Sequence, residues 1–213
     1  MRAGSMAQKM GALVTGERAT QLEDADNHLV SRFLAGDRSA FDSLFAKYQE
    51  YVYNIVYGIL GKPEEAQDVT ADVFLTVFKS LKGFRRGSRF ATWLYRVAVN
   101  RAVDSARSAK LRSWLPFDEA VMAIPDSKDS PERSFVKKEE RSVVQQVLMK
   151  VPLKYRDILA LRYYQDLSIE EISETLHCSV SAAKVRLHRA RLQFKEKYVE
   201  QFGAEQNESI PLP

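Results

Sequence analysis

The chain has 213 residues, of which 45% are hydrophobic and 28% are charged, and its formal net charge is +4 at pH 7. This length allows one large domain or two small ones, and the modest charge excludes a histone-like polycation although it still favours polyanionic partners. No run is long and apolar enough for a membrane span, and no secretory signal precedes the first predicted helix. The single cysteine, Cys178, excludes an intramolecular disulfide. These features together indicate a cytoplasmic protein.

The N-terminal part of the sequence predicts a disordered tail followed by two helices. Residues 1–25 lack a sustained apolar period and contain several Gly, Ala and charged residues. A short helix is expected from about residue 27 to 35, since Gly36 suits a helix C-terminus. A long helix is expected over about 39–60, because its apolar residues recur at helical spacing. These residues are Phe41, Leu44, Phe45, Tyr48, Val52, Ile55, Val56 and Ile59.

The third predicted helix combines an acidic face with surplus apolar surface. It begins at Pro63, which suits the first turn of a helix, and runs to about Leu81. Acidic residues near a helix N-terminus stabilise its macrodipole, so these carboxylates have a purely structural explanation. The apolar residues form a band too wide for one buried seam, which favours a docking surface for a partner protein. The acidic residues are Glu64, Glu65, Asp68 and Asp72, and the apolar ones are Val73, Phe74, Val77 and Phe78.

A basic, aromatic segment follows the third helix. Residues 82–90 are predicted to form a flexible loop, and a helix is expected over about 91–110. Aromatic rings stack on unpaired bases while cations hold phosphates, so this composition is typical of single-strand binding. The alternative is that the same rings simply close a hydrophobic core.

The spacing of the aromatic residues bears on these alternatives. Phe90, Trp93 and Tyr95 lie within six positions, so they cannot all point inward from one helix. We therefore expect Leu94 and Val97 to lie inside and part of the aromatic set to lie at the surface.

The sequence changes character at residues 113–135. Proline residues punctuate an acidic stretch with little periodicity, which predicts a flexible linker. Helical pattern returns at about Ser134, and Pro152 starts a further helix. No strand-rich stretch and no internal repeat occurs in the sequence. The chain is therefore predicted to be all-α, with two helical domains joined by a flexible linker.

Residues 168–191 have the pattern of a helix-turn-helix. Ser168 and Glu171 can form a capping box for the first helix, and Ser179 can cap the second. The second helix presents basic side chains to solvent, as does a recognition helix that enters the major groove. Amphipathic helices with basic faces also occur in proteins that never bind nucleic acid, so the motif alone does not establish DNA binding. The basic residues are Lys184, Arg186, His188, Arg189 and Arg191.

Three segments of the chain, taken in order, carry a resemblance to one known family. The first comprises Glu65, Ala66, Asp68, Val69, Val73 and Phe74. The second comprises Phe90, Thr92, Trp93, Leu94, Tyr95, Arg96, Val97, Ala98, Asn100, Asp104 and Arg107. The third comprises Lys184, Arg186, Leu187, His188, Arg189, Ala190 and Arg191. They resemble, in the same order, the polymerase-binding helix, the promoter-melting segment and the promoter-recognition helix of bacterial RNA polymerase sigma factors, in particular the extracytoplasmic-function (ECF) group of the sigma-70 family. The chain also lacks the extra domain that larger sigma factors carry between the two modules.

The resemblance implies both an organisation and a function. A sigma factor of this group binds core RNA polymerase, recognises the minus-35 and minus-ten promoter elements and promotes DNA melting as a transcription initiation factor. Its partners would be core polymerase, duplex and single-stranded promoter DNA, and an anti-sigma factor, with no cofactor, no metal, no small-molecule substrate and no insertion in a membrane. The implied organisation is a disordered tail (1–25), a region-2-like helical domain (26–112), a linker (113–135), a region-4-like, winged-helix-like helix-turn-helix domain (136–203) and a disordered tail (204–213).

The resemblance also assigns candidate residues to three surfaces. The core-polymerase surface would comprise Glu65, Asp68, Val69, Asp72, Val73, Phe74 and Val77. The minus-ten surface would comprise Phe84, Arg85, Arg86, Ser88, Phe90, Trp93, Tyr95, Arg96, Asn100 and Arg101. The minus-35 surface would comprise Ser181, Lys184, Val185, Arg186, His188, Arg189 and Arg191.

Physical arguments divide these residues by role. A bidentate contact to a base edge discriminates by roughly 1–3 kcal/mol, and we expect Lys184, His188 and Arg189 to contact base edges. Arg186 and Arg191 are expected to bind phosphate or to close the C-terminal module by contacts within it, because five long side chains cannot all reach bases. The residues expected to follow the phosphates of separated or upstream DNA are Arg96, Asn100 and Arg101.

Two other classes of function fit the sequence less well. A dimeric helix-turn-helix regulator that acts without polymerase would need a self-complementary dimer face, and no heptad seam occurs. It would also leave the N-terminal module unexplained. An enzyme would need clustered catalytic or metal-binding groups, but His28, His177 and His188 are widely scattered, so no catalytic residue and no metal site is expected.

Overall fold

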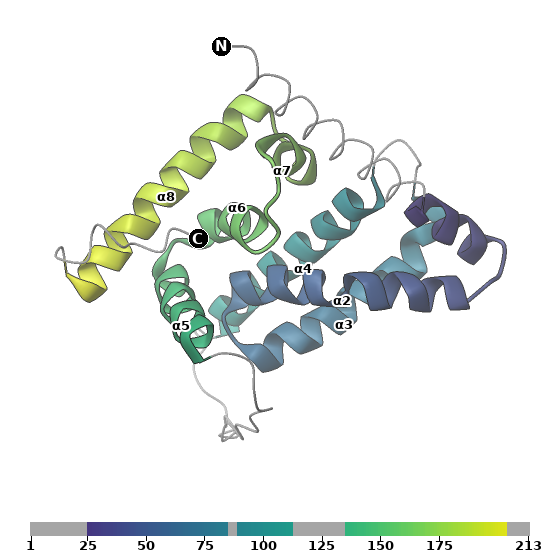
Figure 1. Ribbon diagram of the computed structural model, residues 1–213, viewed down its shortest axis with the longest axis horizontal. Helices are drawn as coiled ribbons and strands as arrows, with labels where there is room; N and C mark the ends of the chain where they lie inside the picture. The colour runs from purple at the N-terminus through teal and green to yellow at the C-terminus, as the bar shows by residue number, and fades with distance from the viewer. Residues whose placement is uncertain (1–24, 85–88, 113–134, 204–213) are drawn as a thin grey trace, which may run out of the picture.

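The computed structural model describes residues 25–84, 89–112 and 135–203, and every regular element in these ranges is a helix (Figure 1). This confirms the predicted all-α class. The predicted tails apart from residue 25, nearly all of the predicted linker, and Arg85, Arg86 and Ser88 lie outside the described residues.

The N-terminal module contains helix 25–34, α2 (Ser39–Leu60), α3 (Pro63–Ser80), the short 3₁₀ helix η1 (Leu81–Gly83) and α4 (Phe90–Arg112). The C-terminal module contains α5 (Phe135–Lys150), α6 (Leu153–Tyr163), α7 (Ile169–Thr175) and α8 (Val180–Phe202). Within the described ranges, none of these helices combines the length and apolarity needed to cross a bilayer.

Local sequence signals determine where α2 ends and α3 begins. Gly61 adopts the left-handed conformation (φ 78°) at the end of α2, and its N–H donates to Tyr57 O at 2.8 Å. A side chain at Gly61 would also collide with Met149, because a Cβ atom would lie 2.2 Å from its Sδ. Pro63 occupies the first turn of α3, where its missing N–H costs nothing. The predicted boundary between the two helices is therefore confirmed.

The core of the N-terminal module lies between α2, α3 and α4, which pack pairwise against one another. The predicted apolar stripe of α2 is buried, except that Phe45 is 39% exposed. Helix 25–34 is fastened to α2 by Asp26, a buried carboxylate that accepts hydrogen bonds from Lys47 Nζ and the Tyr48 hydroxyl. The predicted short first helix is thereby part of the folded module.

The C-terminal module contains the predicted helix-turn-helix, formed by α7 and α8. The Ser168 hydroxyl accepts from the Glu171 N–H at 3.2 Å while the Glu171 carboxylate accepts from the Ser168 N–H at 2.9 Å, which is the predicted capping box. Ser179 Oγ accepts from the Ala182 N–H at 3.2 Å and caps α8. His177 turns the chain between the helices in the left-handed conformation (φ 51°). Helices α5, α6 and α7 all pack on α8.

The two modules pack against each other and share one hydrophobic core. Helix α2 contacts α5 and α6, and α4 contacts α6 and α7, so α6 lies between α8 and the N-terminal module (Figure 1). The sequence predicted the two modules and the segment between them. It contained no signal for this packing.

Candidate nucleic-acid and protein interfaces

The outer face of α8 carries cations and one apolar residue on a rigid helix. Its inner face is buried and includes Ala183, Leu187 and Ala190. The outer side chains include the three that were predicted to contact base edges, and all three are exposed. Val185, at the centre of this face, is 51% exposed. The exposed outer residues are Ser181, Ala182, Lys184, Val185, His188, Arg189, Arg191 and Leu192.

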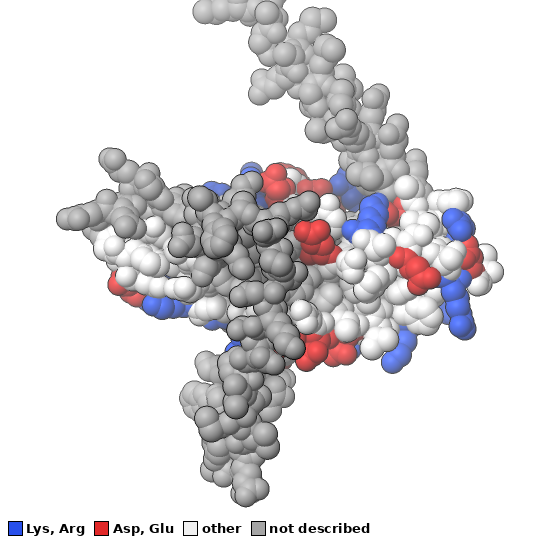
Figure 2. Space-filling view, turned by 60° about the horizontal axis from the view of Figure 1, so that its bottom comes forward, with Lys and Arg blue, Asp and Glu red and all other residues white. Residues whose placement is uncertain are grey.

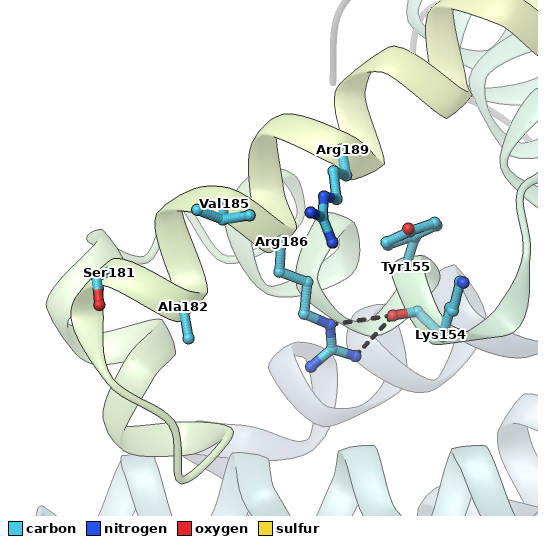
Figure 3. Close-up of a pocket in the computed structure, with 7 residues that line it drawn as sticks. All are labelled: Lys154, Tyr155, Ser181, Ala182, Val185, Arg186 and Arg189. Carbon is cyan, nitrogen blue, oxygen red and sulfur yellow. Dashed lines mark hydrogen bonds between the residues drawn. The ribbon is translucent and has the colours of Figure 1, made fainter.

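Half-buried Arg186 and exposed Arg191 both form hydrogen bonds from α8 to α6. One Nη atom of Arg186 donates to the two carboxylate oxygens of Asp157 at 2.6 and 2.7 Å, and its Nε and Nη donate to Lys154 O at 3.0 and 2.7 Å (Figure 3). Arg191 Nε donates to the Tyr163 hydroxyl at 2.6 Å. Of the two roles expected for these arginines, phosphate binding or closure of the module, their contacts support closure.

Asp157 is a buried carboxylate with 6% exposure. Burial raises the pKa of Asp157 above its usual value, and the charge of Arg186 acts in the opposite direction. The Ile158 N–H also donates to this carboxylate at 2.7 Å. The ion pair therefore holds both helices in one relative position, because leaving either group buried without its partner is costly.

A basic cleft runs beside the outer face of α8. It has a volume of about 600 Å³ and lies between the N-terminal turn of α6 and the first turns of α8 (Figure 3). Lys154 and Tyr155 line it from α6, and the sequence analysis did not include either residue. Their position next to Pro152 at a helix start was visible in the sequence, but their proximity to α8 was not. The residues from α8 are Ser181, Ala182, Val185, Arg186 and Arg189.

Most of the aromatic residues predicted for minus-ten binding are buried. Phe84, Phe90 and Tyr95 are all buried, and Trp93 is half-buried. Of the three rings that could not all point inward, Trp93 is therefore the one that is partly exposed. Phe90 and Tyr95 are buried because α4 is covered from two sides, by α2 and α3 and by α6 and α7. The ring centroids of Phe84, Phe90 and Trp93 lie 5.3–6.0 Å apart and form an aromatic cluster.

Tyr95 lies at a cleft between the modules. This cleft has a volume of about 380 Å³ and is lined by Tyr48, Tyr51 and Tyr95 from the N-terminal module and by Leu167 and Glu171 from the C-terminal one. Burial is the main cause that raises the pKa of Tyr95. The expected burial of Leu94 is confirmed, whereas Val97 is half-buried.

The polar residues of the minus-ten set have different environments. Arg96 donates from Nη to Glu174 O at 2.9 Å and from Nε to Thr175 O at 3.3 Å, at the C-terminal end of α7. Arg101 donates to the Thr76 hydroxyl at 2.8 Å and remains exposed. Asn100 is also exposed. The structure thus leaves Asn100 and Arg101 accessible and engages Arg96 with the other module.

The predicted core-polymerase set divides into buried and exposed residues. Asp68 and Asp72 are exposed, and Glu65 is half-buried and pairs with Lys62 Nζ at 2.6 Å. The apolar members lie in the core, because α2 and α4 cover α3 on two sides, so in this arrangement they cannot contact a partner. These buried residues are Val69, Val73, Phe74 and Val77.

Two other apolar residues occupy the outer face of α3. Leu75 is 57% exposed and Phe78 is 41% exposed. With Asp68 and Asp72 they lie at positions i, i+4, i+7 and i+10, which is one face of a helix. We call these four residues the docking stripe. On the face shown in Figure 2, acidic side chains form separate spots among uncharged surface, so charge alone does not define a single patch there.

The three histidines are exposed and far apart in the chain. Among residues 25–84, 89–112 and 135–203, no three His, Cys, Asp or Glu side chains lie close enough to hold a metal ion.

Comparison with known proteins identifies both modules. Residues 44–112 match the model of Sigma-70 region 2, and residues 141–194 match the model of Sigma-70, region 4. The chain is 33% identical over 180 residues to the RNA polymerase sigma-H factor of Pseudomonas aeruginosa, covering 79% of this chain and 91% of that protein. It is 32% identical over 163 residues to the ECF RNA polymerase sigma factor SigW of Bacillus subtilis, covering 73% and 87%.

Two solved structures have a similar fold. One is CnrH in complex with the cytosolic domain of CnrY, with a TM-score of 0.58, 21% identity and coverage of 81% of this chain and 96% of that one. The other is the sigma factor RpoE in complex with the anti-sigma factor NepR from Bartonella quintana, with a TM-score of 0.55, 18% identity and coverage of 74% and 95%.

Proposed function

Because the chain belongs to the extracytoplasmic-function group of the sigma-70 family and is a polymerase-associated transcription initiation factor, we propose a division of labour among its described surfaces. Helix α8 recognises the minus-35 element, α4 with the segment before it captures the separated minus-ten strand, and α3 docks on core RNA polymerase. The observation that carries this proposal is the exposed cationic face of α8 on a fully capped helix-turn-helix, together with a second module that matches region 2.

Recognition of duplex DNA follows from the geometry of α8. A rigid helix with exposed long donors can enter the major groove, where each base pair presents a distinct pattern of donors and acceptors. Lys184, His188 and Arg189 are exposed and so can reach base edges. Lys154, across the basic cleft, is placed to bind the phosphate backbone. Phosphate contacts would supply affinity and position, and the base contacts would supply specificity.

Strand capture requires a surface that holds unstacked bases. Flipping a base out of the duplex costs a few kcal/mol, which stacking and phosphate contacts must offset. The aromatic cluster of Phe84, Phe90 and Trp93 adjoins the arginines of α4, so it combines both kinds of contact. Phe84 and Phe90 are buried, so they support this surface from within, and half-buried Trp93 is the ring most accessible to a base.

Docking on polymerase is assigned to the docking stripe rather than to the buried residues of α3. Exposed apolar groups supply the hydrophobic area of an interface, and the flanking carboxylates Asp68 and Asp72 supply charge complementarity. Core polymerase would carry out all the chemistry, and the protein would act beside it in the cytoplasm. By the family resemblance, an anti-sigma protein would hold the chain inactive. A dimeric regulator independent of polymerase is not favoured, since region 2 would then have no role.

The proposal is tested by run-off transcription with purified core polymerase across genomic promoter fragments. Specific transcripts that depend on the protein are expected, and their start sites would reveal the recognised promoter elements. Absence of both specific transcripts and stable association with core polymerase would refute the proposal.

A further inference from the structure

A bulky apolar side chain lies at the centre of the outer face of α8. Val185 is in the second turn of this helix and is 51% exposed. It lies outside the hydrophobic core, to which α8 contributes through its opposite face. A β-branched residue at an exposed site also gives a helix no advantage, because its side chain loses rotamer freedom there. Packing and helix formation therefore do not explain this valine.

The side chains around Val185 are either short or polar. One turn earlier, Ser181 and Ala182 are exposed and short, so another surface can approach Val185 closely from that side. One turn later, His188 and Arg189 are exposed and carry hydrogen-bond donors. Figure 3 shows Val185 between Ala182 and Arg189 along the helix, and all three residues line the basic cleft. Val185 is therefore an apolar group with donors beside it, on the face that the proposed function places against DNA.

The base edges in a major groove differ in whether they present an apolar group. Guanine presents two acceptors, cytosine an amino donor, and adenine one acceptor and one donor, whereas thymine presents a C5-methyl group beside its O4 acceptor. An isopropyl group makes no hydrogen bond, so against a polar edge it would displace water without replacing the hydrogen bonds that are lost. Against a methyl group it would displace water from apolar surface on both sides, which is favourable.

We infer that Val185 recognises the C5-methyl group of a thymine in the minus-35 element. The inference rests on the proposed function of α8, and it adds the class of base that one position of the element carries. Val185 thereby selects thymine over cytosine, because unmodified cytosine lacks the methyl group. Lys184, His188 and Arg189 then bind the acceptors of neighbouring base pairs.

Removal of single methyl groups from the DNA tests this assignment. The full chain is bound to core polymerase, and promoter fragments identified by run-off transcription carry deoxyuridine in place of one thymidine of the minus-35 element at a time. Affinity is measured by competition with a fluorescein-labelled promoter fragment. For the wild-type protein, one replacement should weaken binding by about fourfold, the factor expected for one buried methyl group. The same replacement should have no effect on Val185→Ala.

A matched variant and a second base separate the methyl contact from a general loss of affinity. Leu192→Ala removes the other large exposed apolar side chain of α8, two turns further on, and should keep the wild-type ratio at that thymine. Cytosine and 5-methylcytosine are then compared at the same position, each paired with guanine. The wild-type protein should prefer 5-methylcytosine by about fourfold, whereas Val185→Ala should bind the two equally. Circular dichroism checks that both variants keep the wild-type helicity.

Two results would overturn the inference. One is insensitivity of the wild-type protein to every thymine methyl group of the element, and the other is a methyl effect that persists undiminished in Val185→Ala. Failure of the wild-type protein to bind promoter fragments together with core polymerase would instead contradict the proposed function.

Discussion

Arg186 on α8 and Asp157 on α6 form an ion pair in which one guanidinium nitrogen lies 2.6 and 2.7 Å from the two carboxylate oxygens. The same guanidinium binds Lys154 O, beside the basic cleft. A residue that the sequence motif places among the DNA contacts therefore fastens the recognition helix to its module. Its effect on DNA binding would be indirect, through the position of α8.

Asp157→Ala should destabilise the protein. The change leaves the Arg186 guanidinium without its charged partner, and we expect a loss of about 1–3 kcal/mol in the free energy of unfolding. Urea unfolding followed by circular dichroism measures it. Glu200→Ala is the control, because Glu200 is an exposed helical residue 2.9 Å from Lys197 and such pairs contribute under about 1 kcal/mol. Equal losses in the two variants would contradict a special role for the buried pair.

Lys184→Ala combined with Arg189→Ala should weaken promoter-specific transcription while association with core polymerase persists. Both side chains are exposed on the outer face of α8, and loss of base contacts worth about 1–3 kcal/mol each should reduce promoter affinity at least about tenfold. Run-off transcription and a polymerase pull-down give the two readouts. Lys195→Ala, further along the same helix and also exposed, should have the smaller effect. Undiminished promoter output in the double variant would count against the assignment.

Asp72→Arg combined with Leu75→Ser should reduce affinity for core polymerase. The pair reverses a charge and removes exposed apolar area from the docking stripe, and neither change opens a cavity in the core. Phe74→Ala is unsuitable for this test, because Phe74 is buried and truncation of a buried Phe costs about 3–5 kcal/mol. Pull-down with core polymerase measures the effect, and unfolding curves confirm that the fold is intact. Normal association of the double variant would exclude this stripe as the docking surface.

Lys154→Ala should weaken binding to duplex DNA by a similar factor for every sequence. Lys154 lines the basic cleft and its predicted contact is a phosphate, so the slope of log affinity against log salt should become smaller by about 1. Fluorescence anisotropy over a range of salt concentrations measures the slope. Lys150→Ala removes the same charge from an exposed site outside this cleft and should leave the slope unchanged. A change confined to one DNA sequence would instead indicate a base contact.

Helix ends were predictable because their causes are local. Gly61, Pro63, Ser168 and Ser179 act on backbone groups within about four residues of themselves, so the sequence alone shows what they do. The boundaries of α2 and the capping box of α7 followed from these residues. The exposed cations of α8 were equally visible, since the helical period places them opposite the apolar face.

The orientation of α3 and α4 could not be predicted in the same way. The sequence showed that α3 carries more apolar residues than one seam can bury. It could not show that two neighbouring helices cover Val73, Phe74 and Val77 while Leu75 and Phe78 remain exposed. Tyr95 is buried for the same reason, because helices from both modules surround α4.

The sequence by itself determined the helical elements, their caps, the two modules in order and the cationic recognition helix, because each depends on residues close together in the chain. Only the tertiary structure decided which of the candidate residues are free to bind. Arg96 bonds to carbonyls 78 and 79 positions away, and Arg186 bonds to a carboxylate 29 positions away. Such pairings depend on how the helices pack, and packing is set by the shapes of whole surfaces rather than by any local pattern.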